Sequence, residues 1–174
     1  MFTKNPFNFD YSYLSLPDKF YSLTKASSLT APNLYILNSQ LCDDVNISPQ
    51  EFKNWLPFIG NENIALQSFS QAYAGHQFGH FTLLGDGRAV ILGEHITKNN
   101  NRFDIQIKGS GRTPYSRGGD GKATLKAMLR EYIISESMFY LRIPTSRSLC
   151  VIKTGQTVHR ETAHTGAALL RVMK

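Results

Sequence analysis

The sequence has few cysteines, no long apolar run and no block of basic residues. Its 174 residues include two cysteines, Cys42 and Cys150, which fit no metal-ligand spacing, so neither a disulfide framework nor a zinc site is predicted. No apolar run reaches the length of a membrane-spanning helix, and residues 1–10 lack the basic and apolar regions of a signal peptide. We therefore expect a cytoplasmic protein with no membrane partner.

Charge is the one unusual feature of the composition. The formal net charge is +6 and the sequence pI is about 9.4. An ordinary basic surface and a polyanionic ligand explain this excess equally well. Lysine and arginine are scattered and form no nucleic-acid-binding motif, so we expect no nucleic-acid partner. With 41% hydrophobic residues, the chain is long enough to bury the core of one domain.

Local patterns predict an α+β domain. The run 33–38 is apolar enough for a short strand, and Ser48 caps a predicted helix that ends near Trp55. Residues 103–108 alternate between apolar and polar side chains, as in a half-buried strand. Together with the apolar run 89–94, they predict two neighbouring antiparallel strands.

The second half of the chain predicts one major helix followed by strands. The helix spans about 121–141, with Asp120 as its N-cap. Its apolar face is built from several residues at helical spacing, Leu125, Met128, Leu129, Tyr132, Ile133 and Tyr140. Residues 148–153 and 157–161 predict two strands joined by a turn at Thr154–Gln156, and 167–173 predicts a strand or a short helix.

Residues 84–132 contain the groups that suit a nucleoside triphosphate. Gly85 and Gly87 allow backbone N–H groups to approach phosphate oxygens, and Arg88 offers forked donors. An Asp-Gly hairpin turn is the simpler interpretation of the same residues. Lys108 ends a strand and Glu131 lies on the next helix, an arrangement that protein kinases use to position phosphates. A solvated lysine and a surface glutamate are the alternatives.

Two further motifs are less specific. Asp120 and Gly121 precede the long helix, where an anion would be favoured, although simple helix capping needs no ligand. His76 and His80 have the spacing of a helical metal pair, but the neighbouring glycines argue against a helix and no third ligand follows. We expect structural histidines there.

The order of these motifs closely resembles the selenoprotein O (SelO, formerly YdiU) family over most of residues 30–172. The resemblance is carried by Tyr73–Gly79, Leu84–Ala89, Lys108–Gly111, Thr113–Arg117, Gly119–Gly121, Arg130–Tyr132, Ser135–Glu136, Ile143–Thr145 and Arg160–Thr162. Members of this family are kinase-like proteins that bind ATP in an inverted pose and transfer AMP to hydroxyl side chains of other proteins.

The resemblance implies a role for each matching residue. The nucleotide-binding residues would be Gly85, Gly87, Arg88, Lys108, Asp120, Gly121 and Arg171. Glu131 would orient Lys108, and Arg171 would be one of two arginines that grip the phosphates. The expected domains are an N-terminal extension over 1–70, packed along a kinase-like N-lobe over 71–174 that has an antiparallel sheet and one major helix.

Part of the family's catalytic apparatus has no counterpart in this chain. The second arginine, the catalytic aspartate and the ligands for Mg²⁺ or Mn²⁺ are expected in a C-lobe beyond Lys174, so the chain reads as an N-terminal fragment. We expect a catalytically incomplete piece of a protein adenylyltransferase, with unknown protein substrates and possibly complemented by a separately encoded C-lobe. A non-catalytic ATP-binding or interaction module and a degraded gene product are the alternatives.

Overall fold

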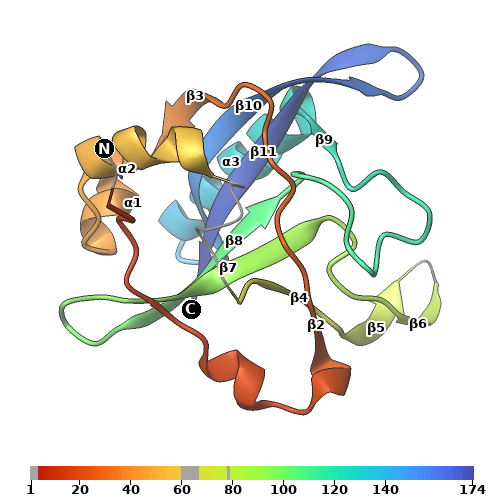
Figure 1. Ribbon diagram of the computed structural model, residues 1–174, viewed down its shortest axis with the longest axis horizontal. Helices are drawn as coiled ribbons and strands as arrows, with labels where there is room; N and C mark the ends of the chain where they lie inside the picture. The colour runs from red at the N-terminus through yellow and green to blue at the C-terminus, as the bar shows by residue number, and fades with distance from the viewer. Residues whose placement is uncertain (1–3, 60–66, 78) are drawn as a thin grey trace.

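The computed structural model describes residues 4–59, 67–77 and 79–174, and within them one large antiparallel sheet organises the chain (Figure 1). Seven strands follow the order β2-β4-β7-β8-β11-β10-β3, and two short strands, β1 and β9, join at β7 and β11. The strands are β1 Phe9–Asp10, β2 Tyr21–Leu23, β3 Asn33–Leu37, β4 Phe69–Gln71, β7 Ala89–Ile96, β8 Arg102–Lys108, β9 Ala123–Thr124, β10 Arg147–His159 and β11 Ala163–Met173. A separate hairpin pairs β5 Ala74–Gln77 with β6 His80–Leu83.

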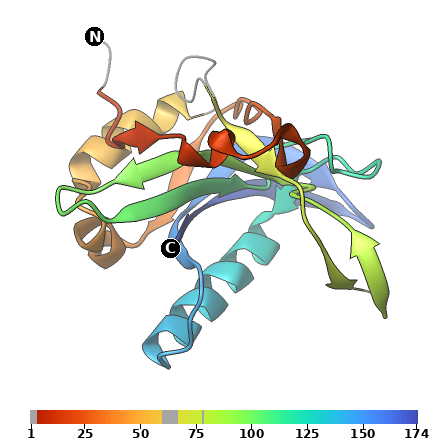
Figure 2. The same ribbon diagram turned by 90° about the horizontal axis from the view of Figure 1, so that it is seen from below.

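Helices cover both faces of the sheet (Figure 2). α1 (Ser39–Asp44) and α2 (Pro49–Trp55) lie on one face, and α3 (Leu125–Tyr140) lies on the other. Short 3-10 turns span Ser12–Ser15, Asp18–Phe20 and Leu56–Phe58. An α+β architecture with an antiparallel sheet and one major helix is therefore confirmed. Among the described residues, no helix is long and apolar enough to cross a membrane. The cytoplasmic location stays a prediction.

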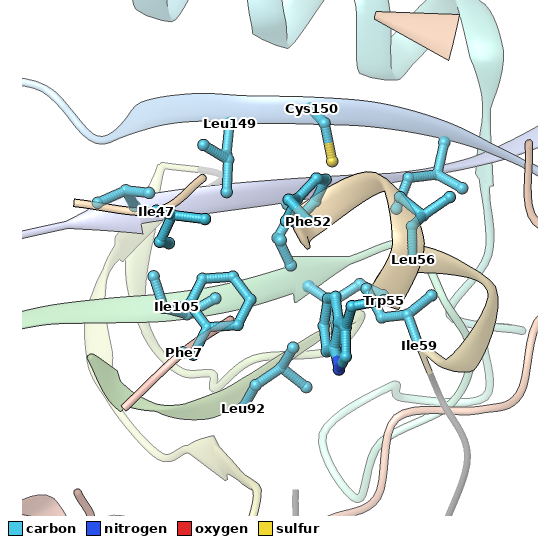
Figure 3. Packing of buried hydrophobic residues seen from close by; sticks show 14 of the residues in the cluster. Phe7, Ile47, Phe52, Trp55, Leu56, Ile59, Leu92, Ile105, Leu149 and Cys150 are labelled. Carbon is cyan, nitrogen blue, oxygen red and sulfur yellow. The ribbon is translucent and has the colours of Figure 1, made fainter. Parts of the chain in front are cut away.

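The larger core lies between the sheet and the first two helices (Figure 3). Phe52 and Trp55 of α2 are almost fully buried, and Phe7 packs edge-on against both rings. Each such side chain contributes about 1.5–3 kcal/mol by leaving water. β3 also pairs with β10. Residues 4–59 therefore supply three strands of the sheet, β1, β2 and β3, and much of this core.

Several sequence predictions match the structure closely. β3 and α2 occupy the predicted ranges, and the Ser48 hydroxyl accepts a hydrogen bond from the Glu51 N–H at 3.4 Å. β7 and β8 are antiparallel neighbours. These elements depend on local alternation and capping, which single-sequence patterns report well.

The predicted start of the long helix was wrong. α3 begins at Leu125, and its N-cap is Thr124, whose hydroxyl accepts from the Ala127 N–H at 3.3 Å. The chain cannot become helical earlier because residues 123–124 form β9 and pair with β11. Asp120 instead accepts from the Lys122 N–H at 3.0 Å, a local turn that resembles a cap in sequence.

Two other predictions need correction. β10 runs unbroken from Arg147 to His159, so no turn separates two strands there. Gly155 sits inside it at φ +74, where the register with β11 shifts, so it marks a bulge. In α3, Ile133 and Tyr140 are exposed, although both were assigned to the apolar face of the helix.

Candidate functional site: a cationic pocket at the sheet edge

The pocket is built around Lys108, the last residue of β8. Its neighbours across the sheet are Ala89 of β7 and Leu169 of β11. The Lys108 Nζ donates to both carboxylate oxygens of Glu131 on α3, at 2.9 and 2.8 Å. The structure therefore joins the lysine and glutamate that the sequence singled out, and it does so between a central strand and the helix packed beneath it.

Glu131 also holds a second cation. Arg171 lies on β11, and its Nη1 donates to Glu131 Oε1 at 3.0 Å. The other edge of the Arg171 guanidinium donates to the Gln106 side-chain oxygen, with Nε at 3.0 Å. Lys108 and Arg171 are thus fixed side by side through one carboxylate and one amide. Such bonds restrict the rotamers of two long side chains before any ligand arrives.

Gln106 extends the network toward the glycine-containing loop. It is buried in β8, and its Nε2 donates to Asp86 Oδ2 at 3.2 Å. The Gln71 N–H donates to the same oxygen at 3.3 Å. Asp86 therefore ties its loop to two strands, β4 and β8. Its role here is to position the backbone on either side of it, Gly85 and Gly87.

Burial changes the electrostatics of this network. Desolvation lowers the pKa of Lys108, with a smaller contribution from the nearby charge of Arg171, while Glu131 opposes the shift. Desolvation likewise raises the pKa of Asp86. Because the side chains of Lys108, Glu131 and Arg171 are only 18–23% exposed, their charges are poorly screened by water. An anion placed beside these cations would interact with them strongly.

The glycines allow two loops to pack against each other. A Cβ on Gly85, which has φ +146, would come within 2.6 Å of the Tyr115 ring, and one on Gly87 would come within 2.8 Å of the Tyr115 carbonyl oxygen. Thr113 and Ser116 donate side-chain hydrogen bonds of 2.6 Å to the carbonyl oxygens of Asp86 and Gly87. The segment 84–88 is therefore not a hairpin turn between paired strands, because β6 pairs with β5 and β7 pairs with other strands.

Asp120 and Gly121 close the far side of the pocket. The Asp120 carboxylate accepts from both terminal nitrogens of Arg160, at 2.8 and 3.0 Å. These hydrogen bonds lower the pKa of Asp120. Gly121 has φ +66 and packs so closely on the Gly111 carbonyl that no side chain would fit. Since α3 begins four residues later, an anion here would meet a loop and Arg160, not a helix N-terminus.

One cavity of about 470 Å³ collects these residues. Its wall includes every residue assigned to nucleotide binding, namely Gly85, Gly87, Arg88, Lys108, Asp120, Gly121 and Arg171. Glu131 lies behind Lys108 and outside the lining. Six cationic residues line the cavity (Arg88, Lys108, Arg117, Lys122, Arg160 and Arg171), against two carboxylates, Asp86 and Asp120. This excess of positive charge suits a polyphosphate.

Sequence reasoning missed two residues of this site. Gln106 lies two residues before Lys108 and therefore on the same side of β8, so the strand period of two could have identified it. Arg160 lies in one of the strings that carried the family resemblance, but its contact with Asp120 spans 40 positions and left no local signal. His76 and His80 lie on the two strands of the β5–β6 hairpin, so they do not form a helical metal pair.

The described residues do not fit a metal site. Within 4–59, 67–77 and 79–174, no group of three or more His, Cys, Asp or Glu side chains could hold an ion. The carboxylates in and behind the pocket are each bonded to a cation or an amide, as with Glu131 and Lys108. The cationic lining of the pocket suits anionic groups, whereas the described residues assemble no ligand set for Mg²⁺ or Mn²⁺.

Comparisons with known proteins show which family the sequence matches. The sequence model of the family described as "Protein adenylyltransferase SelO" matches residues 4–174. A relative from Pelagibacter ubique is 54% identical over 95% of this chain, and one from Geobacillus kaustophilus is 52% identical over 94%. A Clostridium botulinum (strain Alaska E43) relative is 52% identical over 98%. All three are named "Protein nucleotidyltransferase YdiU", and this chain spans about a third of each, 35% of its length.

Proposed function

The chain belongs to the SelO family of protein adenylyltransferases, and from this premise we propose that it holds the phosphates of ATP for AMP transfer to protein hydroxyl groups. The pairing of Lys108 and Arg171 through Glu131 carries the proposal. Glu131 can neutralise only one of these two cations, and the remaining positive charge is expensive to bury unless a further anion offsets it. Because relatives are about three times longer, the complete transfer activity is proposed for a longer protein that contains this unit.

The chemistry explains what these cations would do. In AMP transfer, the oxygen of a Ser, Thr or Tyr side chain forms a bond to the α-phosphorus, and the bond from that phosphorus to the bridging oxygen breaks. Pyrophosphate leaves with additional negative charge, and the hydroxyl proton passes to a base. Fixed cations stabilise such developing charge because they need no reorganisation during the reaction. Lys108 and Arg171 are the residues we assign to this task.

The role of a metal ion is separate from the role proposed for this chain. Mg²⁺ or Mn²⁺ would neutralise phosphate charge and orient the triphosphate when bound. The described residues assemble no metal ligands. The chain's own contribution is binding and orientation of the nucleotide.

The architecture is consistent with a kinase-like N-lobe. A central strand ends in Lys108, and the helix that follows carries the carboxylate that pairs with it. Protein kinases use the same strand-to-helix pairing to place phosphates. The kinase-like assignment and the inverted pose of ATP are part of this proposal, as is the domain boundary at residue 70.

Nucleotide titrations test the proposal. Calorimetry with ATP, ADP, AMP and adenosine should give affinities that fall in that order, since each phosphate removed deletes contacts with the cationic wall. Arg171→Met should lower the affinity for ATP but not for adenosine. Lys53→Met is the matched control, because Lys53 is an exposed cation on α2 and outside the pocket. Equal affinities for ATP and adenosine would contradict the proposal.

A non-catalytic nucleotide-binding module is the second candidate. It is favoured by the pocket itself, whose cationic lining suits nucleotide binding whether or not transfer follows. Incubation of the chain with labelled ATP, Mn²⁺ and acceptor proteins separates the candidates: binding without label transfer supports the module, and robust transfer by this chain alone refutes it. A degraded gene product would show neither binding nor a cooperative unfolding transition.

A further inference from the structure

Arg160 lies at the turn of the β10–β11 hairpin, between the end of β10 at His159 and the start of β11 at Ala163. This hairpin projects beyond the body of the sheet (Figure 1). The Arg160 guanidinium reaches the loop that joins β8 to β9 and contacts Asp120 and Lys122 there. Arg160 and Asp120 both line the cationic pocket. The contact therefore ties the hairpin to one wall of the pocket.

The hydrogen bonds of Arg160 occupy both terminal nitrogens of its guanidinium. Nη1 donates to Asp120 Oδ2 at 2.8 Å and to the His159 carbonyl oxygen at 2.7 Å. Nη2 donates to Asp120 Oδ1 and to the Lys122 carbonyl oxygen, each at 3.0 Å. Because each terminal nitrogen carries two hydrogens, neither can turn to a phosphate without weakening one of these bonds. The terminal nitrogens of Arg160 are therefore committed to the protein.

Asp120 places a negative charge at the wall of a pocket that suits anions. Its side chain is 40% exposed, and its hydrogen bonds with Arg160 lower its pKa, so the carboxylate is ionised at neutral pH. The other carboxylate of the wall, Asp86, is buried and bonded within the protein. An unpaired Asp120 would repel each phosphate of a bound nucleotide, since both are negatively charged. The bidentate pair with Arg160 removes most of that repulsion.

We propose that Arg160 is a positioning residue for the nucleotide: it neutralises the Asp120 carboxylate and fixes its direction, so that the pocket wall accepts the phosphates, while Arg160 itself forms no bond to them. This role rests on the proposed function, since it requires that the pocket hold phosphates. The side chains of Arg160 and Asp120 are 43% and 40% exposed, and pairs at such sites contribute little to folding stability. The effect of the pair is therefore expected on ligand binding.

Calorimetric titration of charge variants with ATP, AMP and adenosine tests this role. Arg160→Met leaves Asp120 unpaired and should raise the Kd for ATP about fivefold in about 0.1 M salt, with a smaller rise for AMP and none for adenosine. Asp120→Asn removes the negative charge and should bind ATP at least as tightly as the unmodified chain. The double variant has the net charge of the unmodified chain, so it should return the Kd for ATP to within about twofold of the original value.

A second exposed ion pair supplies a matched control. Arg102 pairs with Asp10 at 2.7 Å, and these side chains are 43% and 50% exposed. Arg102 begins β8, at the opposite end of the strand from Lys108 and outside the pocket. The strand between them spans roughly 20 Å, which exceeds the screening length of about 10 Å at this salt concentration. Arg102→Met should therefore leave the affinity for ATP unchanged.

Other outcomes would overturn the role assigned to Arg160. If Arg160 bound the phosphates directly, the double variant would bind ATP as weakly as Arg160→Met. If the pair only held the loop in place, Asp120→Asn and Arg160→Met would weaken binding equally, for adenosine as well as for ATP. Unchanged ATP affinity in Arg160→Met, or its failure to fold in urea titrations, would also overturn it. Absence of ATP binding by the unmodified chain would instead refute the proposed function, and this role with it.

Discussion

Replacing Lys108 by methionine separates binding from folding at the proposed site. Methionine keeps most of the side-chain volume and removes the ammonium group. Glu131 retains Arg171 as a partner at 3.0 Å, so the substitution leaves no unpaired carboxylate. Burial lowers the pKa of Lys108, which shows that the folded protein disfavours its charge. Since desolvation of the ammonium offsets the attraction of Glu131, the free energy of unfolding should change by less than about 1 kcal/mol.

The effect on ATP binding should be much larger. One charge-assisted hydrogen bond contributes about 1.5–3 kcal/mol, which corresponds to roughly a 10- to 150-fold increase in the Kd for ATP. Calorimetry gives the Kd, and urea unfolding followed by the fluorescence of the single tryptophan gives the stability. Lys53→Met serves as the control for charge removal at an exposed site. An ATP affinity within twofold of the unmodified chain would refute the reasoning, as would unfolding of Lys108→Met before any nucleotide is added.

Five further substitutions test other parts of the structure. Glu131→Gln leaves two partly buried cations without a carboxylate and should lower the free energy of unfolding by about 2–3 kcal/mol, measured by urea unfolding; no loss would show that the pairs contribute nothing. Thr124→Ala should cost about 1 kcal/mol through loss of the α3 N-cap, whereas Asp120→Asn should cost less, since its pair with Arg160 is exposed; the reverse ranking would restore Asp120 as the cap. Phe52→Ala should cost about 3–5 kcal/mol in a single cooperative transition, and a separate transition would mean that the N-terminal residues unfold independently. Burial lowers the pKa of His95. The stability that neutral His95 contributes is therefore complete above the ordinary histidine pKa of about 6.5 and is lost as the pH falls through the lowered pKa. The melting temperature should drop on acidification below about pH 6.5, and it should drop less in His95→Gln.

The sequence predicted those parts of the fold that depend on local patterns. β8 alternates strictly, and α2 has a capping serine followed by proline, so both ranges agree with the structure. β10 was divided in two because Gly155 resembles a turn, whereas pairing with β11 on one side carries the strand through a bulge. The pairing with β11, the next strand along the chain, determines that outcome, and no turn signal at Gly155 reports it.

The pocket was predictable in its parts but not in its connections. Lys108 and Glu131 were identified from their places on a strand and the following helix, and the family resemblance added Arg171. The pairing of β8 with β11 explains why one carboxylate holds both cations and why Gln106 supports them. Ile133 and Tyr140 were misassigned because apolar residues at helical spacing do not show which side of the helix the sheet covers.

The most direct test of the phosphate site is an NMR titration of the isotope-labelled chain with ATP, with adenosine as the reference ligand. The account predicts ATP-dependent shifts in the amides of residues 85–88 and in the side-chain signals of Lys108 and Arg171, with no comparable shifts for adenosine. Residues of α2, which lies on the other face of the sheet and outside the pocket, should not respond. An absence of shifts at millimolar ATP, or shifts confined to another surface, would contradict it.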